Sequence, residues 1–185
     1  MAVDHPADTP AVGAASVTDA PQPDAPAFPP TTLAAFLACC AGDWMALRSR
    51  FELGDGEPPA EEADSWFSSE RGELQVSYLA AADPAEPGGL LIRPGGEAGS
   101  GRTLHFSADG AFQAETAVPF RGGWQLWPDG SLELICSGDG WERRERLWFT
   151  KPNLRLRSCL EQHADGRPAR ASFSSEIRRV SRPGS

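Results

Sequence analysis

From residue 44 onward, hydrophobic and polar positions alternate in short segments, the pattern of half-buried β-strands. Ten such segments can be marked: Trp44–Leu53, Gly72–Ala81, Gly89–Ile92, Arg102–Ser107, Gly110–Thr116, Gly122–Trp127, Ser131–Ser137, Arg143–Thr150, Leu154–Gln162 and Ala169–Val180. Asp-Gly pairs at residues 55–56, 109–110, 129–130, 139–140 and 165–166 favour hairpin turns, because glycine and, less readily, aspartate accept a positive φ. About ten strands without long helices between them predict an all-β antiparallel meander.

A meander of this size either forms a sandwich or closes into a barrel, and closure removes the exposed strand edges. Glu57–Ala63 and the Gly-Gly-rich region Pro84–Gly101, which surrounds the short segment Gly89–Ile92, are expected to be loops. A short helix should precede the strands. Thr31 or Thr32 can cap it and Gly42 can end it. Its hydrophobic residues recur at helical spacing: Leu33, Phe36, Leu37 and Cys40.

Residues 1–30 have a different composition, with seven prolines, eight alanines, four aspartates and one aromatic residue, Phe28. Such a segment cannot bury enough apolar surface to offset its ordering entropy, so a disordered tail is expected, followed by one domain over residues 31–182. The start of the chain lacks the features of a secretory signal, and no apolar run approaches the about 18 residues of a membrane span. A cytoplasmic protein is therefore expected.

Charge is unevenly distributed along the chain, whose net charge is −9. Residues 31–140 hold 6 basic and 17 acidic residues, whereas residues 141–185 hold 11 basic and 5 acidic residues. The acidic body argues against nucleic-acid binding, which needs a basic face along the phosphates, while the basic last third could hold a smaller anion.

The four cysteines are Cys39, Cys40, Cys136 and Cys159. They contain no CxxC pair, and the three histidines lie far apart, so no metal site is expected. We expect four free thiols in a reducing compartment.

The most informative segment is Leu154–Gln162, because its two faces differ in chemistry. Arg155, Arg157, Cys159 and Glu161 share one face, and leucines share the other. Two arginines on one face either form an anion site, since each can bind a carboxylate bidentately, or project into solvent.

The neighbouring segments could add to this face. Glu176 and Arg178 share a face of the last strand, where they could either complete a pocket or form cross-strand salt bridges. On the preceding strand, Glu145 lies on one face, and Arg144 and Trp148 lie on the other. The indole of Trp148 could stack on a flat ligand or simply pack.

Three stretches of the sequence resemble the signature of the S-type (CpcS/CpeS-like) phycobiliprotein lyases. ERLWF at 145–149 followed by PNLRLRS at 152–158 resembles that family's ERIWFxxPNLRLRTS, and ASFSSEIR at 171–178 resembles its closing ASFxSEIR. Gly42-Asp43-Trp44 followed by Arg48 is similar to its GxWxxxR start. The resemblance spans roughly residues 31–180.

The resemblance implies a lipocalin-like or fatty-acid-binding-like up-and-down β-barrel with an N-terminal helix. It implies no prosthetic group, but a phycobilin substrate, phycocyanobilin or phycoerythrobilin, held non-covalently. The bilin would be passed to an apo-phycobiliprotein subunit, where a cysteine forms a thioether with its ring A ethylidene group. A bilin carrier or a phycobiliprotein assembly chaperone without attachment activity remains an alternative. The chain could act alone, as a homodimer or as a heterodimer with a paralogue.

The resemblance also assigns candidate site residues. Arg155 and Glu176 would be catalytic: Arg155 would hold a propionate, and Glu176 would accept hydrogen bonds from pyrrole nitrogens and bias protonation. The other candidate ligand-binding residues are Arg48, Arg157, Trp148, Glu145 and Cys159. Cys159 departs from the family pattern, and its thiol could either pack or form a transient adduct.

Overall fold

The computed structural model describes residues 28–53, 67–95 and 101–180. The expected helix is present as α1 (Leu33–Cys40), and the Oγ1 of its N-cap Thr32 accepts a hydrogen bond from the backbone N–H of Ala35 at 3.2 Å. Ten strands follow: β1 (Gly42–Glu52), β2 (Phe67–Leu79), β3 (Gly88–Pro94), β4 (Arg102–Phe106), β5 (Ala111–Glu115), β6 (Phe120–Leu126), β7 (Leu132–Gly138), β8 (Trp141–Lys151), β9 (Leu154–His163) and β10 (Pro168–Arg178). Within the described residues, α1 is too short to cross a membrane.

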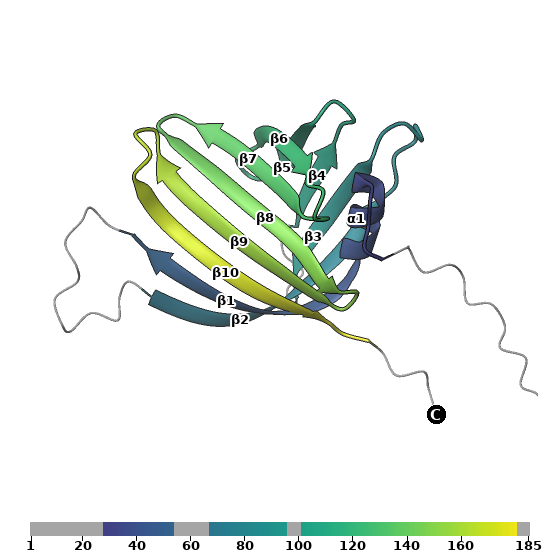
Figure 1. Cartoon of the computed structure of the whole chain (residues 1–185), viewed down its shortest axis with the longest axis horizontal. Coiled ribbons are helices and arrows are strands. Elements are labelled where there is room, and N and C mark those ends of the chain that lie inside the picture. The colour runs from purple at the N-terminus through teal and green to yellow at the C-terminus, as the bar shows by residue number, and fades with distance from the viewer. Residues whose placement is uncertain (1–27, 54–66, 96–100, 181–185) are drawn as a thin grey trace, which may run out of the picture.

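The ten strands form a closed antiparallel barrel (Figure 1). Each strand pairs with its neighbours in sequence, and β1 closes the ring by pairing with β10, so that Trp44 lies opposite Arg178. The prediction of an up-and-down barrel with a short N-terminal helix is confirmed, and the sandwich alternative is excluded. The predicted Asp-Gly turns are also confirmed where they are described, since Gly110, Gly130, Gly140 and Gly166 all have positive φ.

In the Gly-Gly-rich region, the strand predicted at Gly89–Ile92 is confirmed, but the loop expected around it begins later than predicted on the C-terminal side. The strand β3 has seven residues and pairs with both β2 and β4. Its alternating residues Leu90 and Ile92 are buried in the barrel interior, and their burial stabilises the strand despite the flanking glycines. The expected loop at 57–63, the Asp-Gly pair at 55–56 and most of the tail at 1–30 lie outside the described residues.

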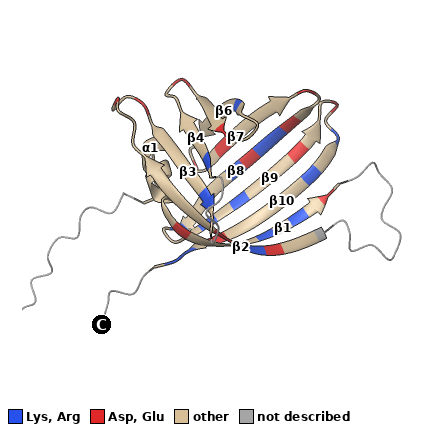
Figure 2. Ribbon diagram, turned by 180° about the vertical axis from the view of Figure 1, so that it is seen from behind, with Lys and Arg blue, Asp and Glu red and all other residues tan. Residues whose placement is uncertain are grey.

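The interior of the barrel is divided between an apolar part and a charged part. The apolar core includes helix residues and large side chains from most strands: Leu33, Phe36, Leu37, Trp44, Leu104, Phe106, Phe112, Leu132 and Leu147. The charged part lies along β1, β8, β9 and β10 and includes Arg48, Glu145, Arg155, Arg157 and Glu176; Figure 2 shows the positions of charged residues on these strands. On β9 the arginine face points inward, while Leu160 on the opposite face is exposed. Charged side chains therefore occupy lumen positions that would be apolar in an ordinary barrel.

Candidate functional site

The register between β9 and β10 brings the predicted charged residues together. Glu176 pairs with Arg155 and Ser174 pairs with Arg157, so Glu176 lies beside both guanidiniums. Arg155 Nε donates to Glu176 Oε2 at 2.6 Å, and Arg157 Nε lies 3.3 Å from Glu176 Oε1. Arg155 and Glu176 are 1% and 0% exposed, so this is a fully buried ion pair that water does not screen.

A second carboxylate extends this cluster onto β8. Glu145 lies 3.0 Å from Arg157 Nη1 through its Oε1 and accepts a hydrogen bond from Arg143 Nη2 at 3.0 Å through its Oε2. Positive and negative side chains therefore alternate in a row of ion pairs across three neighbouring strands. We call these five residues the charged cluster: Arg155, Glu176, Arg157, Glu145 and Arg143.

The carboxylates of the charged cluster are held ionised by their neighbours. Burial alone would raise the pKa of Glu176, but the charges of Arg157 and Arg155 outweigh burial and hold the pKa below its ordinary value. Burial likewise acts to raise the pKa of Glu145, and Arg157, Arg102 and Arg143 together lower it below the ordinary value. Both groups therefore carry full negative charge near neutral pH.

Some polar atoms of the charged cluster have unused hydrogen-bonding capacity. Arg155 Nη2, Arg157 Nε and Glu176 Oε1 are buried and lie close to opposite charges, yet they make no hydrogen bond of good geometry with the described residues. Buried polar groups without a hydrogen bond are uncommon in folded proteins, and they destabilise the folded state unless a partner is supplied. These atoms face one another, so ion pairing holds this part of the charged cluster together without well-aligned hydrogen bonds.

Trp44 connects the charged cluster to helix α1. The guanidiniums of Arg155 and Arg178 lie over its ring at 4.6 Å and 4.7 Å from the centroid. Its indole Nε1 donates to the carbonyl oxygen of Cys40 at 2.9 Å, and Arg178 Nη2 donates to the carbonyl of Cys39. The start of β1 thus fixes both the helix and one side of Arg155.

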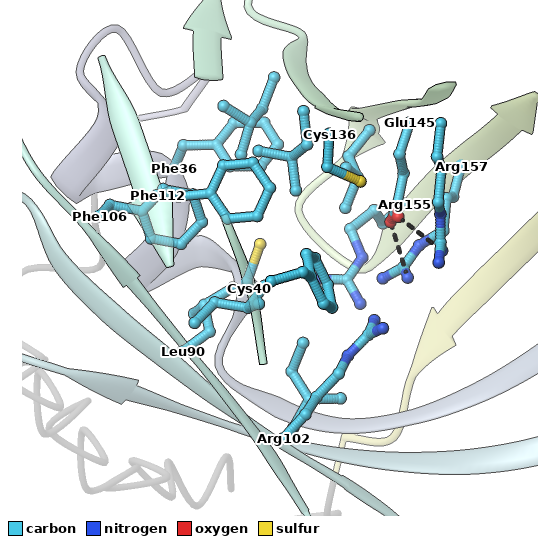
Figure 3. A pocket seen from close by; sticks show the side chains of 17 residues that line it. Phe36, Cys40, Leu90, Arg102, Phe106, Phe112, Cys136, Glu145, Arg155 and Arg157 are labelled. Atoms are coloured by element: carbon cyan, nitrogen blue, oxygen red, sulfur yellow. Dashed lines mark hydrogen bonds and ion pairs between the residues drawn. The ribbon is translucent and has the colours of Figure 1, made fainter. Parts of the chain in front are cut away.

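Two cavities meet at the charged cluster. The one drawn in Figure 3 has an apolar part, formed by residues such as Phe36, Phe106 and Phe112, and a charged part that includes Glu145, Arg155 and Arg157. The other is a polar cavity of about 290 Å³ lined by Arg48, Arg50, Arg102, Arg143, Arg157, Cys159, Glu161, Arg170 and Ser172. A ligand at this boundary would meet an apolar surface on one side and cations on the other.

Most of the predicted site residues reach this boundary. Arg48, Arg157 and Cys159 line the polar cavity, and Arg155 and Glu145 line the apolar one. Glu176 lies behind the two arginines, with its oxygens directed at them, and lines neither cavity.

Two predicted residues need further comment. Trp148 does not belong to the pocket. Because its neighbours Leu147 and Phe149 face inward, Trp148 lies on the outer face of β8, and its ring centroid is 6.2 Å from that of Phe173. Cys159 accepts a hydrogen bond from Arg143 Nε at 3.2 Å, and burial raises the pKa of its thiol. All four cysteines are described and free, as expected.

Four further arginines of the polar cavity were not predicted: Arg50, Arg102, Arg143 and Arg170. Arg143 could have been found, because it has the same strand parity as Glu145. Arg102 could not, since only closure of the barrel brings β4 to the same lumen as β9.

Comparison with known proteins places the chain in a family. Residues 100–179 match the family model described as CpeS-like protein. The chain is 41% identical over 156 residues to chromophore lyase CpcS/CpeS 1 of Paulinella chromatophora, covering 84% of this chain and 92% of that protein. It is 25% identical over 174 residues to chromophore lyase CpcS/CpeS 2 of a Synechococcus strain, covering 81% and 91% of the two chains.

The fold agrees with a solved structure, that of the S-type phycobiliprotein lyase CPES from Guillardia theta. That structure aligns with a TM-score of 0.55 and 20% identity, covering 80% of this chain and 92% of the other. The sequence signature, the barrel with its short helix and the 41% identity to a curated relative agree, and the chain belongs to the CpcS/CpeS family of chromophore lyases, the S-type phycobiliprotein lyases.

Proposed function

We propose that the chain binds an open-chain phycobilin inside the barrel and promotes its thioether attachment to a cysteine of a phycobiliprotein subunit. The observation that carries the proposal is the buried charged cluster, four of whose members line a cavity that has an apolar part: Arg143, Glu145, Arg155 and Arg157. A phycobilin has matching chemistry: a flat conjugated body, pyrrole N–H donors and two propionates. Arginines suit the propionates and a carboxylate suits the N–H groups.

The geometry suggests how the charged cluster divides this work. Arg157 lines both cavities and Glu145 lines the apolar one, and these two residues would contact the pigment. Arg48 would support a propionate in the polar cavity. Glu176 would act as a positioning residue, because it holds the guanidiniums of Arg155 and Arg157 from behind.

The attachment step uses the thiol of the client subunit. The sulfur forms a bond to the ethylidene carbon of ring A, and the thiol proton ends on the bilin, so the C=C bond is replaced by C–S and C–H bonds. Glu145 would stabilise the protonated pyrrole nitrogens, which makes the ethylidene group more electrophilic. Such a site promotes the reaction by orientation and electrostatics rather than by a nucleophile of its own.

The test is to add phycocyanobilin or phycoerythrobilin to the purified chain and then an apo-phycobiliprotein subunit. We expect a coloured complex, followed by pigment on the subunit that survives denaturation in acidic urea. Arg157→Gln should reduce both readouts, because a ligand-facing cation is lost. Arg121→Gln is the matched control: Arg121 is exposed on β6, next to the inward-facing Phe120.

Two outcomes would count against the proposal. If the pigment binds but stays extractable by acid, the chain is a bilin carrier rather than an attachment enzyme. If the protein stays colourless with every phycobilin offered, the proposed ligand itself is wrong.

A further inference from the structure

Arg102 enters the lumen from the side of the barrel opposite the charged cluster. In the closed ring of ten strands, β4 lies five positions from β9 in either direction, so the two strands face each other. Arg102 lines both cavities, as Arg157 does, and Figure 3 shows its guanidinium directed toward Arg155 and Arg157. A ligand that occupies the lumen would therefore lie between Arg102 and the charged cluster.

Arg102 differs from the other arginines of the polar cavity in its pairing. Each of the others lies within ion-pair distance of a carboxylate: Arg48 and Arg50 of Glu70, Arg143 and Arg157 of Glu145, and Arg170 of Glu52 and Glu161. For Arg102, the described residues provide no ion pair and no hydrogen bond to the side chain. Among the described residues, Arg102 therefore has no direct carboxylate partner, and only the more distant charge of Glu145 partly offsets its own.

The electrostatic surroundings of Arg102 agree with this geometry. Burial lowers the pKa of its guanidinium, Glu145 acts in the opposite direction, and the positive charges of Arg157, Arg143 and Arg48 lower the pKa further. An arginine remains charged even so. It is a partly desolvated cation among other cations, and a carboxylate placed there would relieve the repulsion.

A third cavity extends the space around Arg102. It has a volume of about 250 Å³, is lined partly by Leu74, Ile92 and Pro94, and shares Arg48, Arg102 and Arg157 with the polar cavity. These three arginines therefore stand where a charged group could lie next to an apolar surface. A propionate arm of a flat apolar ring system has this combination of groups.

We propose that Arg102 is a specificity-determining residue that binds a carboxylate of the ligand from across the lumen, together with Arg48 and Arg157, so that the site selects tetrapyrroles with free propionates. This inference rests on the proposed function, since it assumes that a bilin occupies the lumen. It adds a residue outside the charged cluster to the propionate site, and it predicts that the preference for the free acid over neutral esters of the same pigment depends on Arg102. The guanidinium can make a charge-assisted, bidentate contact with a carboxylate, and its contact with a neutral ester is weaker.

The test compares phycocyanobilin with its dimethyl ester by absorbance titration of the full chain. We expect the wild-type protein to bind the free acid more tightly than the diester. Arg102→Gln should weaken binding of the free acid by about tenfold, the effect of losing one hydrogen-bonded charge contact, and leave binding of the diester unchanged. Arg102→Lys, which keeps the charge but not the bidentate geometry, should retain part of the preference.

Arg121→Gln removes the same charge from the outer face and should leave both affinities as in the wild type. If Arg102→Gln weakens binding of the free acid and of the diester equally, the inference is overturned, because Arg102 would then act through the shape or folding of the cavity. An unchanged preference for the acid in Arg102→Gln would overturn it as well. In both cases the wild-type protein still binds the pigment, so the proposed function stands; only a wild-type protein that binds neither pigment overturns both.

Discussion

Replacing Glu176 by glutamine tests whether the charged cluster stabilises the barrel as a unit. Glu176 is 0% exposed and lies within reach of two guanidiniums, 2.6 Å from Arg155 Nε and 3.3 Å from Arg157 Nε. The amide can still accept a hydrogen bond but carries no charge, so Arg155 loses its buried counterion and Arg157 keeps only Glu145. Breaking a buried ion pair from one side costs about 3–5 kcal/mol, a large part of the total stability of a small domain.

Urea denaturation followed by tryptophan fluorescence measures this loss of stability. We expect the free energy of unfolding of Glu176→Gln to fall by about 3 kcal/mol or more at an unchanged m-value. The matched control is Glu142→Gln, because Glu142 pairs with the half-exposed Arg144 at 3.4 Å, and such surface pairs contribute about 0–1 kcal/mol. Equal losses in the two variants would refute the claim that the charged cluster stabilises the barrel.

The pH dependence gives a second readout of the same variant. Because the folded-state pKa of Glu176 is lowered from its ordinary value of 4.5, the carboxylate contributes stability above that pH and loses it as the pH falls through the folded-state pKa. The wild-type protein should therefore lose stability more steeply than Glu176→Gln as the solution is acidified below about pH 4.5. Glu145 also has a lowered pKa, but it is present in both proteins and contributes equally to both. Parallel curves of unfolding free energy against pH would therefore contradict the reasoning, because they would leave no contribution from Glu176.

Two further changes probe the edges of the site. Trp44→Leu should lower the free energy of unfolding by about 3 kcal/mol, because it removes the hydrogen bond to Cys40 and both cation–π contacts. Thermal or urea denaturation measures this change, and a loss below about 1 kcal/mol would mean that Trp44 does not fix the helix. Trp148→Ala should leave the dissociation constant of phycocyanobilin unchanged in an absorbance titration, because Trp148 lies on the outer face of β8. Weaker binding in Trp148→Ala would place pigment outside the barrel.

The sequence determined much of the fold because the determining signals are local. Alternation with a period of two, Asp-Gly turns and a threonine cap at residue 31 or 32 are set by residues close together in the chain. The alternation, four of the five Asp-Gly turns and the cap at Thr32 are present in the described residues. The length of β3 was underestimated for the same reason. The glycines and proline around Gly89–Ile92 indicated loops locally, whereas pairing with β2 and β4 extends the strand to Gly88–Pro94.

The sequence also determined which charged residues share a face, but not which face points inward. Arg155 and Arg157 necessarily lie on one side of β9, yet the leucines opposite them would suit a core at least as well. The tertiary structure decided the question, because Glu176 on β10 and Glu145 on β8 compensate the arginines inside the barrel. Likewise, only ring closure sets Arg102 across from Arg157, since β4 and β9 face each other without being neighbours in the sheet.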